Sequence, residues 1–275
     1  MTAIPAALVL MAAVLHATWN ALVKGAGDRA VMLALVALGH VIPGIILALI
    51  VPMPAPEAWP FIVASTVIHW GYYFFLSLAY RFGDLSFVYP IAREAAPVLI
   101  ALGALTFADE HLPLLAWIAI GTISSGIFLL AAVRHADPRA IGAALVTSSL
   151  IACYSVVDGI GIRLSGSPLG YIAWLFIAEI FVAGYVALTR WPRVTATASA
   201  SVLIGLTGGI LSGLAYALVL YAKTLAPLGI VSALRETSVI FAALFGILWF
   251  GERQMTRRLI AAAVVAVGIV LLALA

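Results

Sequence analysis

Charged residues are scarce in this chain. Asp, Glu, Lys and Arg make up 9% of its 275 residues, against roughly a quarter in an ordinary soluble domain. Hydrophobic residues make up 65%, and the mean hydropathy is +1.21. So little charge excludes a water-soluble domain built around one core, because too few polar side chains remain to cover it. The composition is typical of a polytopic membrane protein.

Cysteine is nearly absent as well, and Cys153 is the only one. One thiol excludes an internal disulfide framework and a thiolate metal cluster. The sequence also lacks a His-Glu-x-x-His zinc helix and a phosphate-binding loop. Its basic residues are scattered through separate segments rather than gathered in a patch. We therefore expect no cofactor, no metal and no nucleic-acid partner.

Long apolar runs occupy nearly the whole chain. A transmembrane helix needs roughly 20 apolar residues to cross about 30 Å of hydrocarbon, and runs that are apolar on all sides favour helices over the strands of a β-barrel. No basic segment precedes the first run, so we expect a retained helix rather than a signal peptide. Short segments rich in Gly, Pro and charge separate the runs. We predict an all-α polytopic membrane protein with ten transmembrane helices, at 3–23, 30–51, 59–80, 85–107, 113–133, 140–161, 169–190, 201–222, 228–250 and 257–274.

The second half of the sequence repeats landmarks of the first at an offset of 142 residues. At this offset the Arg-Glu pair of "YPIAREAAPV" falls on the Arg-Glu pair of "VSALRETSVI". We interpret the chain as two five-helix repeats, residues 1–139 and 140–275, in a single membrane domain. Because five is odd, the second repeat must enter the membrane in the opposite sense. Inverted repeats of this kind place a binding site near the midplane, between the repeats.

The two Arg-Glu pairs are costly to bury in a membrane. A charged side chain at the centre of a transmembrane helix costs an apparent ~3 kcal/mol, so all four are expected to face the protein interior or water. Adjacent helical residues point about 100° apart, so each Arg needs a partner from the other repeat. We predict reciprocal pairs, Arg93 with Glu236 and Arg235 with Glu94. The pairs either line the substrate pathway or only hold the repeats in register; Pro97, which leaves the carbonyl of Arg93 unbonded, favours the pathway for the first pair.

Further titratable residues lie within the predicted helices. His16 and Asp158 coincide at the repeat offset, and with Glu94 and Glu236 they are candidates for carrying a coupling proton. The alternative for His16 is an imidazole that only bonds a neighbouring group. Glu179, in "WLFIAEIFVAG", has no support from the repeat and ranks below the others.

Aromatic residues are frequent near these positions. Most of them are expected to pack between helices or to lie at the membrane interface. A subset is a candidate for an aromatic wall around the substrate, which would attract an ammonium or an aromatic group. These candidates are Trp19, Trp70, Tyr73, Tyr89, Tyr154 and Tyr216.

Lys and Arg concentrate in alternate connecting segments. By the positive-inside rule these segments face the cytoplasm, and both chain termini then lie outside. Only Arg163 and Lys223 belong to the opposite set of segments. The residues that define the orientation are Lys24, Arg29, Arg81, Arg134, Arg139, Arg190, Arg193, Arg253, Arg257 and Arg258.

The sequence resembles the ten-helix drug/metabolite transporter superfamily, specifically its EamA-type members. The resemblance covers essentially the whole chain and is carried by "LHATWNALVKGAG", "YPIAREAAPVLIALGALTFADE", "YSVVDGIGIR", "SALRETSVIFAALFGILWFGER" and "RRLIAAAVVAVGIVLL". It implies a secondary carrier of a bacterial-type cytoplasmic (inner) membrane, with a central cavity between two five-helix halves and no ATP hydrolysis. Cargo differs among members, and the "HATWNALVK" start is similar to members associated with phosphonate or amine metabolism.

We therefore expect a transporter rather than an enzyme. Its substrate would be a small polar or zwitterionic organic metabolite, such as an amino acid, an amine like choline or a phosphonate-like compound, moved by alternating access. Membrane lipid surrounds such a carrier, and no oligomer is required. The alternatives are a non-transporting scaffold, a lipid-handling protein and an intramembrane hydrolase. A hydrolase would need a nucleophile such as Ser212, with its base supplied by a histidine of the first half.

Overall fold

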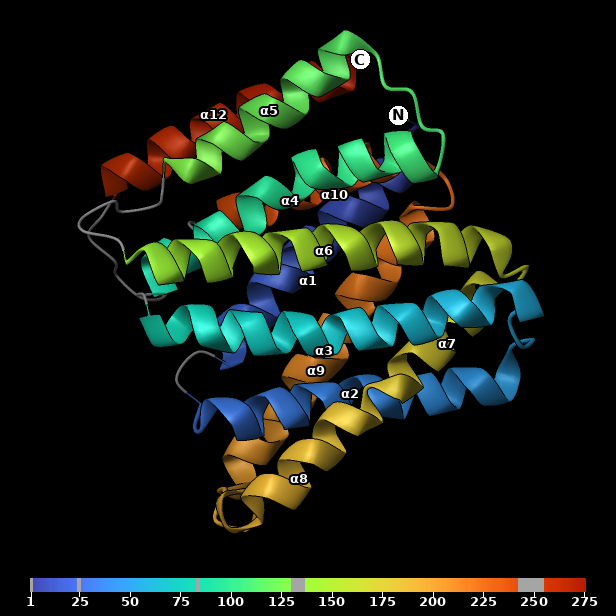
Figure 1. Cartoon of the computed structure of the whole chain (residues 1–275), viewed down its shortest axis with the longest axis vertical. Coiled ribbons are helices and arrows are strands. Elements are labelled where there is room, and N and C mark those ends of the chain that lie inside the picture. Colours follow the sequence, from blue (N-terminus) through green and yellow to red (C-terminus); the bar gives the residue numbers. More distant parts are fainter. Residues whose placement is uncertain (1, 24–25, 83–84, 130–136, 242–254) are drawn as a thin grey trace.

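The computed structural model describes residues 2–23, 26–82, 85–129, 137–241 and 255–275, with the side chains of 80, 85–90, 94, 127 and 255–259 excepted. Most of these residues are helical, and no strand occurs among them. The helices form one bundle, and the marked N and C ends lie at the same end of it (Figure 1). The elements are α1 (Ala3–Val23), α2 (Arg29–Ile50), η1 (Pro56–Ala58), α3 (Trp59–Phe82), α4 (Leu85–Phe107), α5 (Leu114–Phe128), α6 (Pro138–Leu164), α7 (Pro168–Ala178), α8 (Ile180–Thr195), α9 (Ser199–Ala222), α10 (Leu228–Arg235) and α12 (Met255–Leu274).

Many of these helices are long and apolar enough to cross a membrane. Large apolar side chains such as Leu49, Phe74 and Leu188 are exposed on their outer surfaces, as a lipid solvent favours. The architecture is that of a multi-pass helical membrane protein. Six such spans occur among the described residues: Ala3–Val23, Arg29–Ile50, Pro56–Ala79, Pro138–Leu164, Pro168–Thr195 and Ser199–Ala222.

Helices begin at polar residues that cap them. The Asp28 carboxylate accepts hydrogen bonds from the backbone N–H groups of Ala30 and Val31 at the start of α2. Asp137 accepts one from Arg139 at the start of α6, which has Pro138 at its first position. These contacts satisfy backbone donors that have no partner within the helix. The short polar segments of the sequence therefore act as helix boundaries, as predicted.

Two predicted spans are not continuous helices. The span predicted at 169–190 is divided into α7 and α8, which meet at Glu179. In the span predicted at 228–250, α10 ends at Arg235 and a turn follows at 236–237; residues 242–250 lie outside the described residues. Both interruptions therefore fall at a carboxylate, Glu179 or Glu236.

Close helix packing surrounds the interior. α3 packs along α6, α1 along α9, and α5 beside α12 at one edge of the bundle (Figure 1). Between α2 and α9, a Cβ placed on Gly39 would lie 2.6 Å from the Cα of Gly209. Only glycine permits so close an approach of two backbones, as is common between membrane helices. This contact fixes two of the helices that surround the functional site.

Candidate functional site

A cavity of about 740 Å³ occupies the interior of the bundle. Helices α1, α2, α3, α4, α6, α7, α8, α9 and α10 contribute to its wall. Its outermost lining residues are Asp28, Arg29 and Arg190, and its inner part reaches Arg93 and Glu236. This volume is within the usual range of small-molecule sites. The cavity is therefore large enough to hold a metabolite.

Arg93 on α4 and Glu236 at the end of α10 form an ion pair in this wall. Arg93 Nη2 donates to the two Glu236 carboxylate oxygens at 2.8 and 3.1 Å, and Arg93 Nε lies 3.4 Å from one of them. The side chains are 13% and 6% exposed. The contact predicted from the repeat is confirmed. Such a pair withdraws both charges from lipid while its members still border the cavity.

The reciprocal pair predicted between Arg235 and Glu94 lies outside the described residues, since the Glu94 side chain is not among them. The predicted aromatic candidate Tyr89 is outside them for the same reason. Arg235 itself lines the cavity, and its guanidinium lies 6.0 Å from the ring centroid of Tyr216. This distance is within reach of a cation–π interaction.

His16 lies between the ion pair and Trp19. Its Nε2 is 3.2 Å from Arg93 Nη1, and its Nδ1 is 3.3 Å from Trp19 Nε1. Arg and Trp are donors only, and a neutral imidazole has a single acceptor nitrogen, so His16 can accept from one of them at a time. His16 and Trp19 both line the cavity. The imidazole thus bonds its neighbours, which is the alternative considered above, at a position that also borders the cavity.

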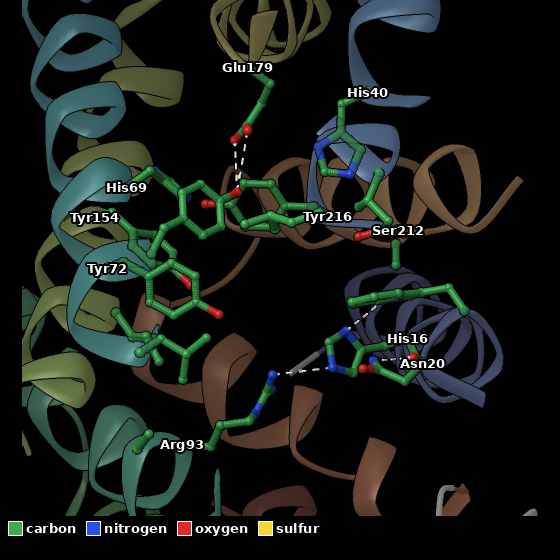
Figure 2. A pocket seen from close by; sticks show the side chains of 18 of the residues that line it. His16, Asn20, His40, His69, Tyr72, Arg93, Tyr154, Glu179, Ser212 and Tyr216 are labelled. Carbon is green, nitrogen blue, oxygen red and sulfur yellow. Dashed lines mark hydrogen bonds between the residues drawn. The ribbon is translucent and has the colours of Figure 1, made fainter. Parts of the chain in front are cut away.

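Five aromatic side chains, His69, Tyr72, Tyr73, Tyr154 and Tyr216, form what we call the ring cluster. His69 stacks on Tyr154 with a centroid distance of 4.0 Å, Tyr72 and Tyr73 are 5.2 Å apart, and Tyr154 meets Tyr216 edge-on at 6.4 Å. The rings come from α3, α6 and α9, and all of them line the cavity. Figure 2 shows the labelled members on one side of the cavity, away from His16 and Asn20.

Trp70 belongs to a different surface. It is 46% exposed and contacts the ring of Phe181 at a centroid distance of 6.0 Å. It does not line the main cavity. The expectation that Trp70 forms part of the aromatic wall is therefore wrong, because its position on α3 points it toward the lipid side rather than the interior.

Asp158 on α6 is fully buried and is not part of the cavity wall. Its carboxylate accepts hydrogen bonds from the hydroxyls of Tyr171 and Tyr216. Tyr216 lines the cavity, so the Asp158 carboxylate is one hydrogen bond away from it. The contact places Asp158 behind the ring cluster rather than in direct contact with a bound solute.

Glu179 lines the cavity at the junction of α7 and α8. The Tyr73 hydroxyl donates to this carboxylate and lies 3.3 Å from each of its oxygens. Figure 2 shows Glu179 and Arg93 on opposite sides of the cavity, with ring-cluster side chains between them. The sequence analysis ranked Glu179 low, although a carboxylate inside a long apolar run was the signal that marked it.

One end of the bundle, which we call the tied end, is where α2, α4, α6 and α9 finish and their connections follow. Arg163 donates to the carbonyls of Lys223 and Ala226 and pairs with Glu110 at 2.7 Å. Glu110 also accepts from the backbone N–H of Leu228 at 2.7 Å. These bonds join three of the connections to one another.

The connection after α2 is bound to the same end. The backbone N–H of Ala55 donates to the Ser165 carbonyl, and the Ser167 hydroxyl donates to the Pro52 carbonyl, both at 2.8 Å. No residue of these four connections lines the cavity. The cavity is therefore shut off at the tied end. This end lies on the right in Figure 1.

The opposite end, which we call the open end, is where α1, α3 and α8 finish. Asp28, Arg29 and Arg190 are there at the outer part of the cavity. Within the described residues, the ion pair recorded there joins Arg193 and Asp28 at 3.0 Å, with side chains 59% and 34% exposed. Among the described residues, the lining of the cavity thus reaches the open end and does not reach the connections of the tied end.

Ser212, the nucleophile that a hydrolase would need, also lines the cavity. In the described part of the chain no hydrogen bond joins it to a histidine, and His16 and His69 bond other groups. Activation of a serine needs an adjacent base that is itself oriented by a third group. The geometry around Ser212 does not supply this arrangement.

Comparison with known proteins adds evidence on the fold. No family model matches the chain, and no curated protein matches it. A solved structure described only as a crystal structure of a protein has a TM-score of 0.80 and 18% sequence identity to this chain, and the match covers 100% of this chain and 98% of the other. The likeness therefore establishes the fold over the whole length.

Proposed function

We propose that this protein is a secondary transporter that moves a small polar or zwitterionic organic metabolite across a membrane by alternating access. The observation that carries the proposal is the cavity, which is accessible at the open end and shut off at the tied end. A carrier has to expose its site to one side at a time. Charged and aromatic groups inside an apolar bundle are costly to keep, and a polar cargo would account for them.

We further propose that the fold is the ten-helix, two-repeat fold of EamA-type drug/metabolite transporters. The packing supports this assignment. In such a repeat α3 with α6 corresponds to α9 with α1, and both pairs pack together. α2 with α7, α4 with α10 and α5 with α12 are contacts between counterparts across the axis. The Arg93–Glu236 pair joins the two repeats in the same way.

Interrupted helices also support a carrier. α7 ends at Glu179 and α10 ends at Glu236, and both carboxylates line the cavity. Backbone groups that lose their helical partners are tolerated at membrane depth where they are buried or line a cavity. Discontinuous helices at the midplane are a frequent source of substrate and ion sites in secondary transporters.

For the location we propose a bacterial-type cytoplasmic membrane, with the open end facing the cytoplasm. Described basic residues at the open end outnumber those at the tied end, where Arg163 and Lys223 are found. The positive-inside rule assigns the richer side to the cytoplasm. The residues at the open end are Arg29, Arg81, Arg139, Arg190 and Arg193.

A two-stage experiment tests the function. Purified protein is screened by thermal shift against amino acids, amines, phosphonates and organic acids, and each hit is then assayed for counterflow into proteoliposomes. We expect saturable counterflow that is lost in Arg93→Gln and kept in Arg193→Gln, a matched change at an exposed position. Lipid scrambling without solute flux would indicate a lipid-handling protein instead. Neither activity would favour a scaffold.

A further inference from the structure

The charges that line the cavity are not evenly placed. Arg93 and Glu236 neutralise each other, whereas the Glu179 carboxylate has no cation within ion-pair distance among the described residues. We propose that Glu179, with the ring cluster beside it, is a binding subsite for the ammonium group of the cargo. The inference rests on the proposed transport function and names the chemical class of the substrate.

Glu179 has unused capacity to accept hydrogen bonds. An ionised carboxylate offers about four acceptor positions, and the donor found among the described residues is the Tyr73 hydroxyl. Its distance of 3.3 Å to both oxygens is longer than the usual O–H···O range of about 2.5–3.0 Å. A cationic donor entering the cavity would therefore gain a partner without displacing an existing ion pair.

The surroundings of Glu179 also suit a cation. Ring faces carry a negative potential that attracts ammonium groups, and Tyr73 is both a member of the ring cluster and the donor to Glu179. His40 lines the same cavity, stacks on Phe176 at 5.1 Å and has a buried Nε2 with no partner among the described residues. Figure 2 shows His40 on the Glu179 side of the cavity.

Another residue of the cavity wall, Arg235, supplies the opposite charge. Arg235 lies against Tyr216 and forms no ion pair with an acidic residue in the described part of the chain. A zwitterion that placed its ammonium at Glu179 could therefore direct its acid group toward Arg235. The structure assigns the cargo this orientation, with the tyrosine rings along its length.

Matched probes separate the two charges. Binding to the purified full-length protein is measured by calorimetry for leucine, isoamylamine and isocaproate, and for phenylalanine, phenethylamine and 3-phenylpropionate. Within each set the skeleton is kept while the acid group or the amine is removed. We expect the amino acids and the amines to bind and the two acids to bind at least about tenfold more weakly.

Two variants test the assignment of each end. Glu179→Gln should weaken the binding of the amino acids and of the amines roughly 10- to 100-fold, which corresponds to the loss of a hydrogen bond to a charged group. Arg235→Gln should weaken the binding of the amino acids by a similar factor and leave the binding of the amines unchanged. Glu57→Gln, at an exposed carboxylate outside the cavity, is the control and should change nothing. Tyr73→Phe keeps the ring and removes the hydroxyl. It should weaken the binding of the amines less than Glu179→Gln does.

Several outcomes would overturn the inference. Equal binding of acids and amines would do so, as would the failure of every amine and amino acid to bind, or unchanged amine binding in Glu179→Gln. If that variant kept binding but lost accumulation driven by a pH gradient, Glu179 would be a coupling group instead. Counterflow of an acid or neutral solute that is unaffected by Glu179→Gln would preserve the transporter and reject the ammonium subsite. The absence of counterflow for every solute would reject the transporter itself.

Discussion

The two ends of the bundle differ in the contacts that their described residues make. At the tied end, Arg163 and Glu110 bind carbonyls and an N–H of the connection between α9 and α10, and Ser167 binds the connection after α2. At the open end the ion pair among the described residues is Arg193 with Asp28, and the Arg139 guanidinium lies 5.8 Å from the ring centroid of Phe82. The cavity is shut off at the end where the described connections bind one another, and its lining reaches the end at Asp28, Arg29 and Arg190.

The kind of contact at the tied end matters as much as the number. Most of its bonds run from a side chain to a backbone carbonyl or N–H. Water can replace such partners when they separate, so each bond contributes only about 1 kcal/mol net when both groups are neutral and roughly 1.5–3 kcal/mol when the side chain is charged. An apolar plug would instead expose hydrophobic surface on opening. A closure made of exchangeable polar contacts is suited to an end that has to open in the proposed transport cycle.

The Arg93–Glu236 pair is the contact whose loss should have the largest effect. It joins α4 to α10 at the inner part of the cavity, between the two ends. Arg93→Gln should lower the free energy of unfolding by about 3–5 kcal/mol, because Glu236 would remain as a buried charge without its partner. The double variant Arg93→Gln/Glu236→Gln should lose less than the sum of the single changes.

Unfolding in denaturing detergent measures the four members of this double-mutant cycle. Additive losses would show that the two side chains do not interact, and the boundary between the two ends would then depend on other contacts. Arg193→Gln is the control, since an exposed pair contributes about 0–1 kcal/mol.

Arg163→Met should open the tied end. The substitution removes the bonds to Lys223, Ala226 and Glu110 while it keeps most of the side-chain volume. Because Arg163 is 32% exposed, we expect the closed form of the tied end to lose about 2 kcal/mol of stability, which is less than the full cost of breaking a buried pair. The population open at the tied end should rise roughly 30-fold, since 1.4 kcal/mol corresponds to a factor of ten.

A cysteine in the cavity measures this change. In a Cys153→Ser background, Ser212→Cys is labelled with a membrane-impermeant maleimide applied from the tied-end side. Labelling should accelerate with Arg163→Met and stay slow with Arg193→Met. Equal labelling in both variants would mean that Arg163 does not hold this end shut.

Ser167→Ala should weaken the tied end by a smaller amount. Its hydroxyl donates to the Pro52 carbonyl and accepts from the Gly170 N–H as the N-cap of α7. Loss of a serine cap costs about 1 kcal/mol. The matched change Ser149→Ala removes a hydroxyl that bonds only within its own helix, to the Leu145 carbonyl. The midpoint temperature of thermal unfolding should fall with Ser167→Ala and change little with Ser149→Ala. Equal effects would mean that the Ser167 hydroxyl does not stabilise the tied end.

The sequence predicted the helices well because hydropathy is summed over a whole span. The predicted spans 3–23 and 85–107 coincide with α1 and α4. The breaks at Glu179 and Glu236 were missed because the surrounding residues remain apolar and contain no proline at the break. Hydropathy measures how a segment partitions into lipid, and a helix broken for one turn partitions like a continuous one when its free backbone groups line a cavity.

The candidate site was predicted where the two repeats share a feature. The Arg93–Glu236 pair followed from the repeat offset and the cost of burying charge. Glu179, His40 and His69 were missed or ranked low, since the same offset aligns them with Ala37, Val182 and Leu211. A repeat comparison finds what both halves keep in common. The proposed cargo carries different groups at its two ends, so it would need binding residues that only one half provides. A comparison of the two halves does not identify such residues.

The smallest predicted effect is at the open end. Hydrogen bonds from the Val31 and Ala30 N–H groups and the nearby Arg193 hold the pKa of Asp28 below its ordinary value, against a smaller opposing effect of burial. A lowered pKa in the folded state stabilises the protein above the ordinary Asp value of about 3.9, and this stabilisation is lost as the pH falls through the lower folded value. Asp28→Asn keeps the cap and removes the ion pair, so it should cost no more than about 0.5 kcal/mol at neutral pH. Thermal unfolding of the original protein and of Asp28→Asn is compared from pH 7 to pH 3, and the small difference in stability between them should shrink at acid pH. Maleimide labelling from the tied-end side should be the same in both. Faster labelling in Asp28→Asn would mean that the two ends are coupled through Asp28.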